Sequence, residues 1–400
     1  MGSIVIAGAG HSGGRLAHLL RKKGYEGKII LIGDENVPPY DRPPLSKAYL
    51  QNEKTLEQCF LYPADSYGAL NIQLCLNTRV EMIDRAEKVV TTADGTNHPY
   101  SKLIISTGAE PNFLAGLDTD DGSIHYLRSA DDAARLKRAL LPGLSVLVIG
   151  AGFIGLEVAA SAVQTGCSVH ISERGDRILQ RLLVPEASAL LRERHEQQGV
   201  SFSFNNEILE IRRQGNKSTV KFADGRKAEY DVIVAGIGVT PRTQLAEKAG
   251  LSVKNGIVVN DKLQSSDADI YAIGDVASFP SELSGGPVRL ESWKNAEDQV
   301  KVVAADICGE DASYNEVPWF WSNQFDFSVQ ITGLPNLGTE SVIMNKSDCV
   351  LFFSTDSNDT FKGLVAIGNV KSFSKYIRKS KDIIKSGALL CDGVLLSEFK

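Results

Sequence analysis

Two glycine-rich turns constrain this sequence more than any other feature. In the first, the apolar residues 4–7 lead into the turn GAGHSG, and a helical pattern follows. The three glycines are Gly8, Gly10 and Gly13. A second apolar stretch, residues 28–35, then ends in Asp34 and Glu35. Strand, glycine turn, helix, strand and acid in this order are typical of a dinucleotide-binding unit. Its helix N-terminus holds a pyrophosphate and its acid binds ribose hydroxyls.

The same pattern occurs again in residues 145–173, SVLVIGAGFIGLEVAASAVQTGCSVHISE. Its glycines are Gly150, Gly152 and Gly155. The pattern predicts a helix from about Phe153 and a strand that ends at Glu173. A single such turn could be a packing turn of an ordinary α/β sheet, but two in context favour two dinucleotide sites. A carboxylate at Glu173 favours NADH over NADPH because it repels a 2′-phosphate, although Arg174 and Arg177 could soften that preference.

Two dinucleotide sites in one chain indicate a flavoprotein, with FAD held by one half and NADH delivered by the other. The length of 400 residues and the 43% hydrophobic content predict two or three domains. A net charge of -6 argues against nucleic acid as the main partner. The six cysteines lie singly, so we expect no metal site, disulfide framework or internal iron–sulfur cluster. No apolar run approaches the ~18 residues of a membrane span, and we expect a cytoplasmic protein.

Further motifs occur in a fixed order along the chain. After the first glycine turn come YDRPPLSK and ISTGAEP, and after the second come AGIGVTPR, IYAIGDVA and PWFWSNQFD. In this combination the sequence resembles the FAD-dependent NADH:ferredoxin reductases of bacterial oxygenase systems, which include the putidaredoxin reductase-like and aromatic-ring dioxygenase reductases. The resemblance runs from residue 3 to roughly residue 335, and more loosely to the end.

The resemblance implies a glutathione-reductase-like flavoprotein architecture with two Rossmann-like domains and a C-terminal α/β domain. The FAD-binding domain would comprise residues 1–108 and 238–313, the NADH-binding domain residues 109–237, and the C-terminal domain residues 314–400. The apolar stretches before ISTGAEP and AGIGVTPR support this division, since both end in glycines and a proline where the chain would leave and re-enter the first domain.

The resemblance also assigns residues to the two cofactors. The proline-rich stretch 38–47 would run across the flavin as a stiff cover, with Lys47 near the flavin atom that receives the hydride. Without the resemblance, Lys47 could be a solvated residue at a helix N-terminus. For FAD, the resemblance adds Ser12, Asp34, Arg42, Val80, Arg128, Asp275, Trp293 and Trp321 to the first glycine turn. For NADH, the predicted residues are Ile154, Glu157, Glu173 and Gly236 together with the second glycine turn.

Glu157 is a polar residue in an otherwise apolar helical stretch. We predict that it faces the flavin and pairs with Lys47 or with the nicotinamide carboxamide, so that Lys47 and Glu157 form the catalytic pair. The alternative is a first-turn carboxylate stabilised by the helix dipole. Trp293 and Trp321 are likewise open to a second interpretation, as core aromatic residues.

Electrons would leave through a separate protein, since the chain lacks a cysteine cluster. The resemblance implies a small [2Fe–2S] ferredoxin that feeds a terminal oxygenase. The basic stretch 371–385 is a candidate docking face, and it contains Lys371, Lys375, Arg378 and Lys379. A solvated helix face is the alternative. Two other functions stay open: an NADH oxidase or monodehydroascorbate-type reductase with a small-molecule acceptor, and a redox-gated binding flavoprotein.

Overall fold

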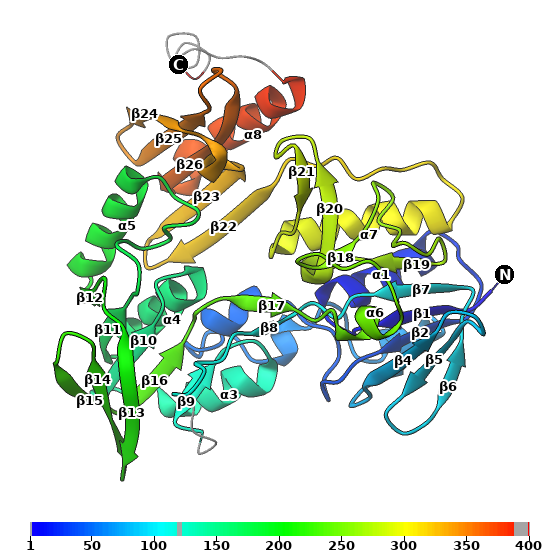
Figure 1. Ribbon diagram of the computed structural model, residues 1–400, viewed down its shortest axis with the longest axis horizontal. Coiled ribbons are helices and arrows are strands. Elements are labelled where there is room, and N and C mark those ends of the chain that lie inside the picture. Colours follow the sequence, from blue (N-terminus) through cyan, green and yellow to red (C-terminus); the bar gives the residue numbers. More distant parts are fainter. Residues whose placement is uncertain (1, 118–121, 388–398, 400) are drawn as a thin grey trace. The chain divides into compact units, whose positions relative to one another are not determined.

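The computed structural model describes residues 2–117, 122–387 and 399 (Figure 1). The chain forms two compact units, each of which is described by itself. The first comprises residues 1–42, 56–110 and 240–318, and the second comprises residues 43–55, 111–239 and 319–400. The short strands β8 (Ala109–Pro111) and β17 (Val239–Pro241) lie where the chain passes from one unit to the other.

The first unit is built on a five-stranded sheet with the order β19-β7-β1-β2-β3. Its strands are β1 (Ile4–Ala7), β2 (Ile29–Ile32), β3 (Ile72–Cys75), β7 (Lys102–Ile105) and β19 (Ile270–Ala272). All neighbours pair in parallel, as expected for strands that are buried on both faces. Helices α1 (His11–Lys22) and α7 (Trp293–Ile307) pack against each other. The sheet order reverses between β1 and β7, which is where ligands bind in doubly wound folds.

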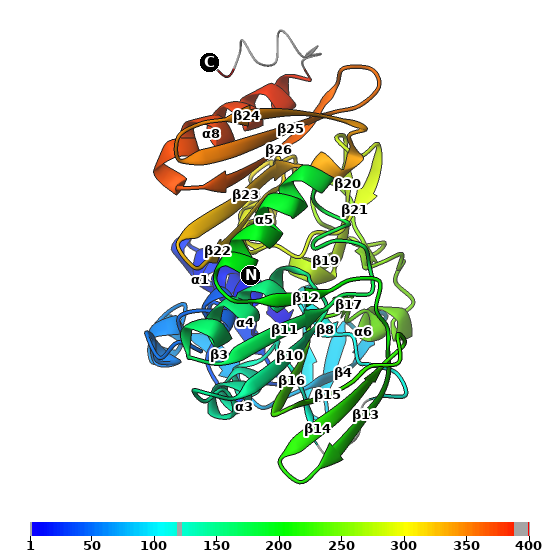
Figure 2. The ribbon, with the colours of Figure 1, turned by 90° about the vertical axis from the view of Figure 1, so that its left-hand side faces the viewer.

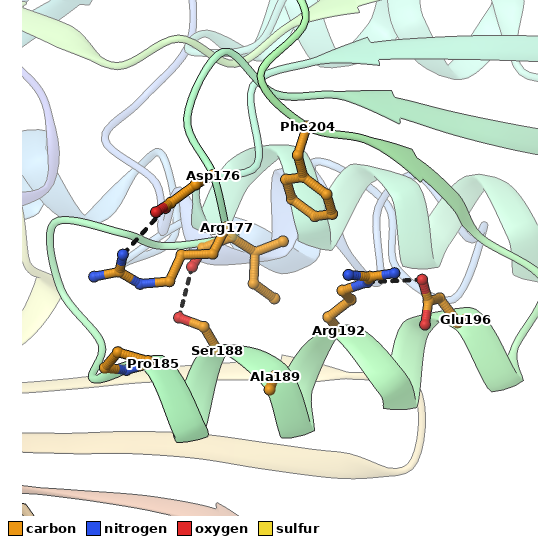
Figure 3. Close-up of a pocket in the computed structure, with 9 residues that line it drawn as sticks. Asp176, Arg177, Pro185, Ser188, Ala189, Arg192, Glu196 and Phe204 are labelled. Carbon is orange, nitrogen blue, oxygen red and sulfur yellow. Dashed lines mark hydrogen bonds and ion pairs between the residues drawn. The ribbon is translucent and has the colours of Figure 1, made fainter.

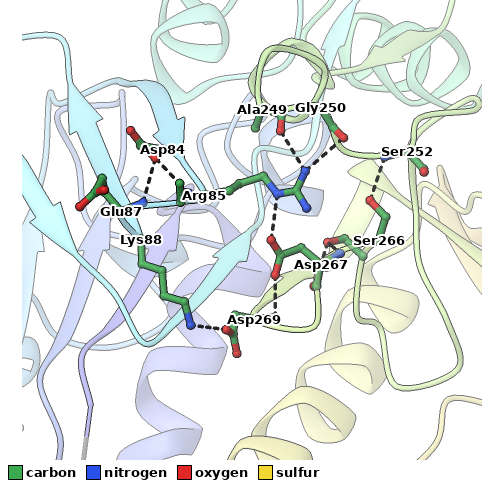
Figure 4. A network of polar contacts seen from close by, with 12 residues as sticks. Asp84, Arg85, Glu87, Lys88, Ala249, Gly250, Ser252, Ser266, Asp267 and Asp269 are labelled. Carbon is green, nitrogen blue, oxygen red and sulfur yellow. Dashed lines mark hydrogen bonds and ion pairs between the residues drawn. The ribbon is translucent and has the colours of Figure 1, made fainter.

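Two small sheets complete the first unit, an antiparallel one and a mixed one in which β18 pairs in parallel with β20. One contains β4 (Val80–Asp84), β5 (Val89–Thr92) and β6 (Asn97–Pro99), and the other contains β18 (Ile257–Val258), β20 (Ala277–Ser281) and β21 (Gly286–Val288). The short helices are α2 (Ser66–Ala69), α6 (Gln244–Lys248), η2 (Glu57–Cys59) and η3 (Gly274–Val276). Figure 4 shows the ion pairs that connect the β4–β5 turn to the loop before β19. Arg85 contacts Asp267 at 2.8 Å, and Lys88 contacts Asp269 at 2.5 Å.

The second unit repeats the parallel arrangement. Its five-stranded sheet has the order β12-β11-β10-β16-β9. The strands are β9 (Ile124–Tyr126), β10 (Ser145–Ile149), β11 (Ser168–Ser172), β12 (Ser201–Ser203) and β16 (Val232–Ala235). Its helices are α3 (Ala130–Ala139), α4 (Phe153–Gln164) and α5 (Pro185–Gln197). An antiparallel sheet of β13 (Ile208–Gln214), β14 (Lys217–Phe222) and β15 (Lys227–Tyr230) is inserted before β16.

The C-terminal part of the second unit is a five-stranded antiparallel sheet with the order β22-β23-β26-β25-β24. Its elements are β22 (Trp319–Gln324), β23 (Phe327–Gly333), η4 (Pro335–Leu337), β24 (Glu340–Asn345), β25 (Cys349–Thr355) and β26 (Phe361–Gly368). Helix α8 (Val370–Ser386) packs across β23, β25 and β26 (Figure 2). Alternating residues of these strands join two cores: Val365 belongs to the core shared with α4, and Leu364 to the core beneath α8.

The predicted fold class is confirmed, with two Rossmann-like sheets and a C-terminal α/β domain. Residues 43–55, which include η1 (Pro43–Ser46) and lie within the predicted FAD-binding domain, group with the second unit. Hydrogen bonds explain this grouping, because Ser161 of α4 donates to the carbonyl of Ser46 at 2.7 Å and Gln51 donates to Ser161 at 3.0 Å. The division into an FAD-binding, an NADH-binding and a C-terminal domain stays a prediction.

Candidate functional site

The first glycine turn joins β1 to α1, and its outer glycines are required by the protein's own packing. Gly8 has φ +120°, and a Cβ atom there would lie 2.2 Å from the carbonyl oxygen of Ser106. A Cβ atom at Gly13 would lie 2.0 Å from the carbonyl oxygen of Gly8. At Gly10, however, the nearest atom would be Nη2 of Arg42 at 3.8 Å, and φ is an ordinary -80°. The protein alone therefore does not need a glycine at position 10.

The second turn, between β10 and α4, repeats this distinction. Gly150 has φ +96° and lies against the carbonyl of Gly236, and a Cβ atom at Gly155 would lie 2.2 Å from the carbonyl oxygen of Gly150. At Gly152 the nearest atom would again be 3.8 Å away, and φ is -78°. Both middle glycines thus keep open a space at a helix N-terminus, where a pyrophosphate can approach the backbone. The open space at each turn fits the pyrophosphate of a dinucleotide, so the chain's residues are compatible with two bound dinucleotides.

The carboxylates predicted for ribose lie near these turns. Glu173 directly follows β11, and its two oxygens accept hydrogen bonds from the backbone N–H groups of Ala151 and Gly175, both at 2.7 Å. Asp34 follows β2 and is paired with Arg242 at 2.9 Å. That pair is half exposed, so it contributes at most about 1 kcal/mol to stability. The carboxylate of Asp34 can therefore also accept a hydrogen bond from a ribose hydroxyl at little cost.

Two other predicted FAD residues of the first unit, Ser12 and Arg42, lie in or near its glycine turn. Ser12 is buried, and its hydroxyl would lie 2.9 Å from a Cβ atom at Gly274, the residue before Asp275. The guanidinium of Arg42, near the turn, pairs with Glu35 at 2.8 Å. Val80 begins β4 and is half buried.

A charged cluster that the sequence did not predict lies at the N-terminus of α1. His11 contacts Asp41 at 3.0 Å and Glu297 at 2.7 Å, and Arg15 contacts Glu297 at 2.7 Å. Burial lowers the pKa of His11, but its hydrogen bonds to the two carboxylates outweigh that effect and raise the pKa above its usual value. Trp293 donates to Asp41 at 2.8 Å, so the predicted FAD contact Trp293 is held by this cluster.

Lys47 and Glu157 form an ion pair in the second unit, with Nζ of Lys47 2.8 Å from Oε2 of Glu157. Lys47 is one of the two partners predicted for Glu157. The carboxylate is buried, and it accepts two more hydrogen bonds, from Ser46 at 2.5 Å and from Ser322 at 2.6 Å. A buried charge with one cation and two hydroxyl donors is well satisfied. The alternative of a first-turn carboxylate is wrong, because α4 begins at Phe153 and its first turn contains no acid.

The polar chain continues beyond Glu157. Gln324 donates to Ser322 at 2.9 Å, and its side-chain oxygen lies 2.7 Å from Nε2 of His195 on α5. Sequence reasoning missed Ser322, Gln324 and His195. The alternation of residues along PWFWSNQFD could have indicated the first two, since residues 322 and 324 share one face of β22.

Three other predicted residues lie elsewhere in the second unit. Trp321 stacks on Trp319 with ring centroids 5.1 Å apart, and alternation places it on the opposite face of β22 from Ser322. Ile154 is exposed in the first turn of α4, and Arg128 directly precedes the capping box of α3. Their predicted cofactor contacts, like those of the other site residues, stay predictions.

A pocket of about 220 Å³ is lined by Asp176, Arg177 and Ile178, which follow β11 closely, and by residues of α5 (Figure 3). Two arginines line it, and both are already paired: Arg177 with Asp176 at 3.1 Å and Arg192 with Glu196 at 2.7 Å. The pocket therefore adds little net positive charge for a 2′-phosphate.

Helix α8 displays a basic face. Lys371, Lys375 and Arg378 are exposed, whereas Lys379 is half buried with its ammonium group 5.9 Å from the ring centre of Phe399. Among the described residues, no helix has the length and apolar character to span a membrane, and no group of three His, Cys, Asp or Glu residues could hold a metal.

The pyridine nucleotide-disulphide oxidoreductase model matches residues 2–299, and the reductase C-terminal model matches residues 319–395. The chain is 41% identical to the ferredoxin–NAD(+) reductase component of an anthranilate 1,2-dioxygenase system from Burkholderia cepacia, over 85% of this chain and 84% of the relative. It is also 41% identical to a rubredoxin–NAD(+) reductase from Pseudomonas putida, over 83% of this chain and 86% of the relative.

Among solved structures, the chain matches a covalent putidaredoxin reductase–putidaredoxin complex with a TM-score of 0.93 and 34% identity, over 98% of this chain and 95% of the matched chain. Water-forming NADH oxidase from Lactobacillus brevis is 19% identical, which shows a shared fold alone. The chain belongs to the pyridine nucleotide-disulphide oxidoreductase family and carries a reductase C-terminal domain.

Proposed function

We propose that this protein is an NADH:ferredoxin reductase of an oxygenase system, with FAD and NAD(H) as its cofactors. The observation that carries the proposal is the pair of glycine turns whose middle glycines, Gly10 and Gly152, are left open by the protein's own packing. The family and the NAD(+) reductases among its relatives support the same cofactors. A bound FAD would supply the chemistry that links a two-electron hydride donor to a one-electron acceptor.

Within this proposal the first glycine turn binds FAD and the second binds NADH. The N-terminus of each helix and the backbone N–H groups of each turn hold a pyrophosphate. Glu173 selects NADH, because its carboxylate accepts ribose hydroxyls and repels a 2′-phosphate. The paired arginines of the neighbouring pocket support this preference.

Lys47 and Glu157 are proposed as the residues that act at the point of hydride transfer. The ion pair fixes the lysine ammonium group, whose positive charge stabilises negative charge that develops nearby. Ser46 and Ser322 hold the carboxylate in one orientation. The chain has no C-x-x-C sequence, so thiol–disulfide chemistry lacks its usual pair of groups here.

The electron acceptor is proposed to be a small [2Fe–2S] ferredoxin that docks on the basic face of α8 and serves a terminal oxygenase. The names of the relatives favour a protein acceptor over a small molecule. Since some relatives are named for rubredoxin, that protein is the acceptor to test beside ferredoxin. A cytoplasmic location stays a prediction.

The test is an anaerobic stopped-flow experiment in which the purified protein is mixed first with NADH and then with a [2Fe–2S] ferredoxin or a rubredoxin. Rapid loss of flavin absorbance, followed by reduction of the ferredoxin, is the expected result. Flavin reduction with transfer to rubredoxin alone would reassign the acceptor. The proposal as a whole fails if the protein holds no flavin, or if NADH does not reduce it.

A further inference from the structure

A line of buried polar side chains connects the Lys47–Glu157 pair to a histidine on a different helix. Glu157 lies on α4, Ser322 and Gln324 lie on β22, and His195 lies on α5. The exposed fraction of each of the four residues is 4% or less. Packing a strand between two helices does not require polar groups, and burying them is costly unless each one is bonded.

The direction of every hydrogen bond in this line follows from the carboxylate. A carboxylate only accepts, so the Ser322 hydroxyl must donate its single proton to Glu157. Ser322 can then only accept from Gln324, and the amide NH₂ group of Gln324 must face it. The amide oxygen of Gln324 therefore faces His195, whose Nε2 must carry the proton.

The surroundings of His195 agree with this assignment. Burial lowers its pKa to about 4, although the hydrogen bond to Gln324 acts in the opposite direction. The imidazole is therefore neutral near pH 7 and carries one ring proton. Phe325 and Phe327 contact the ring edge-on, with centroids 5.1 and 6.2 Å away. The ring is held in place, and its one donor points along the line toward Glu157.

We propose that His195 and Gln324 are positioning residues for Glu157. Acting through Ser322, they fix the orientation of its carboxylate against Lys47 and so set the rate at which NADH reduces the flavin. This inference rests on the proposed role of Glu157 in hydride transfer. All three bonds donate toward the carboxylate, and such a chain strengthens cooperatively in a low-dielectric interior. Losing its far end therefore weakens the bond that touches Glu157.

The test compares flavin reduction by NADH in the holoenzyme and its variants by anaerobic stopped flow. Gln324→Met keeps the side-chain length and removes both hydrogen bonds, and His195→Leu removes the terminal donor. We expect each to slow flavin reduction at saturating NADH about fivefold, the effect of one lost hydrogen bond of about 1 kcal/mol, while the Kd for NADH changes less than twofold. His195→Gln places an amide NH₂ near the position of Nε2 and should keep the rate of flavin reduction within twofold of the wild-type rate.

Two controls separate positioning from a general loss of packing. Ser354→Ala removes a buried hydrogen bond from β25 of the same sheet, at a distance from the line of polar residues, and should leave the rate unchanged. In a Glu157→Ala background, Gln324→Met should cause no further slowing, because the residue it positions is gone.

The outcomes distinguish this inference from the proposed function. The inference alone is overturned if NADH reduces the wild type normally and reduces Gln324→Met at the same rate. It is also overturned if Gln324→Met causes a full fivefold further loss of rate in the Glu157→Ala background. A wild type that NADH does not reduce overturns both. If Gln324→Met does not fold, the comparison of His195→Leu with His195→Gln decides. Nitrogen-15 NMR of the His195 ring gives a readout that does not depend on activity: a proton on Nε2 is expected, and a proton on Nδ1 overturns the assignment.

Discussion

Replacing the middle glycine of the second turn, Gly152→Ala, should separate folding from NADH binding. The new Cβ atom would lie 3.8 Å from the nearest protein atom, which is ordinary contact, and φ of -78° suits alanine. Alanine stabilises by about 0.4–1 kcal/mol by restricting the unfolded chain. Because Gly152 is the N-cap of α4, where alanine is disfavoured by a similar amount, we expect the free energy of unfolding to change by less than about 1 kcal/mol.

The cost should appear in NADH binding instead. The methyl group would occupy the space through which a pyrophosphate approaches the backbone, and losing one charge-assisted hydrogen bond costs about 1.5–3 kcal/mol. At about 1.4 kcal/mol per factor of ten, the Kd for NADH should rise roughly 10- to 100-fold. By contrast, Gly155→Ala would place its Cβ atom 2.2 Å from a carbonyl oxygen and should destabilise the fold itself.

The assay measures the thermal midpoint, the FAD content and the NADH concentration dependence of anaerobic flavin reduction. Gly68→Ala is the matched control, because no atom lies within 4 Å of its Cβ position and it is distant in sequence from both turns. A folded Gly152→Ala protein with a Kd for NADH within twofold of the wild type would refute the reasoning that this glycine is reserved for the ligand.

Three further predictions concern charge. His11 has a raised pKa in the folded state, so its stabilising effect is fully present below its usual pKa of 6.5 and is lost as the pH rises through the folded-state value. The denaturant concentration at the unfolding midpoint should therefore fall over that pH range. An equal fall in the His11→Gln variant would contradict this. Glu173→Ser should raise kcat/KM for NADPH roughly tenfold by removing a like-charge contact with the 2′-phosphate. Steady-state assays with both nucleotides check it. If the ratio of kcat/KM for NADPH to that for NADH does not change, Glu173 does not determine nucleotide specificity. Lys371→Glu and Lys375→Glu should each raise the KM for ferredoxin about two- to fivefold, more at low salt, and leave the KM for NADH unchanged; equal effects from Lys22→Glu on α1 would argue against a docking face on α8.

Local sequence pattern was sufficient for the parallel sheets and their turns. Residues 4–7 and 146–149 are apolar runs followed at once by glycines, and the structure buries both runs and begins a helix within each glycine turn. These features depend on neighbours in sequence, since a glycine with positive φ and a helix start are decided within a few residues. Of the two partners predicted for Glu157, the structure shows Lys47.

The sequence could not show how side chains from distant segments meet. It did not predict that His11 would lie between Asp41 and Glu297, because the first and last of these are 286 positions apart. Nor did it show that residues 43–55 belong with the second unit, since a proline-rich stretch carries no information about which helix will hold it.

By itself, then, the sequence determined the two glycine-rich turns, the order of strands and helices around them and the family resemblance, because each depends on short-range patterns of glycine, apolar residues and acids. Only the tertiary structure decided that the middle glycines have no packing role, that Lys47 is the partner of Glu157, and that Ser46 and Ser322 also donate to its carboxylate. The physical reason is that a buried charge must be satisfied by whichever groups the packed chain brings within about 3 Å, and that distance is set by long-range contacts.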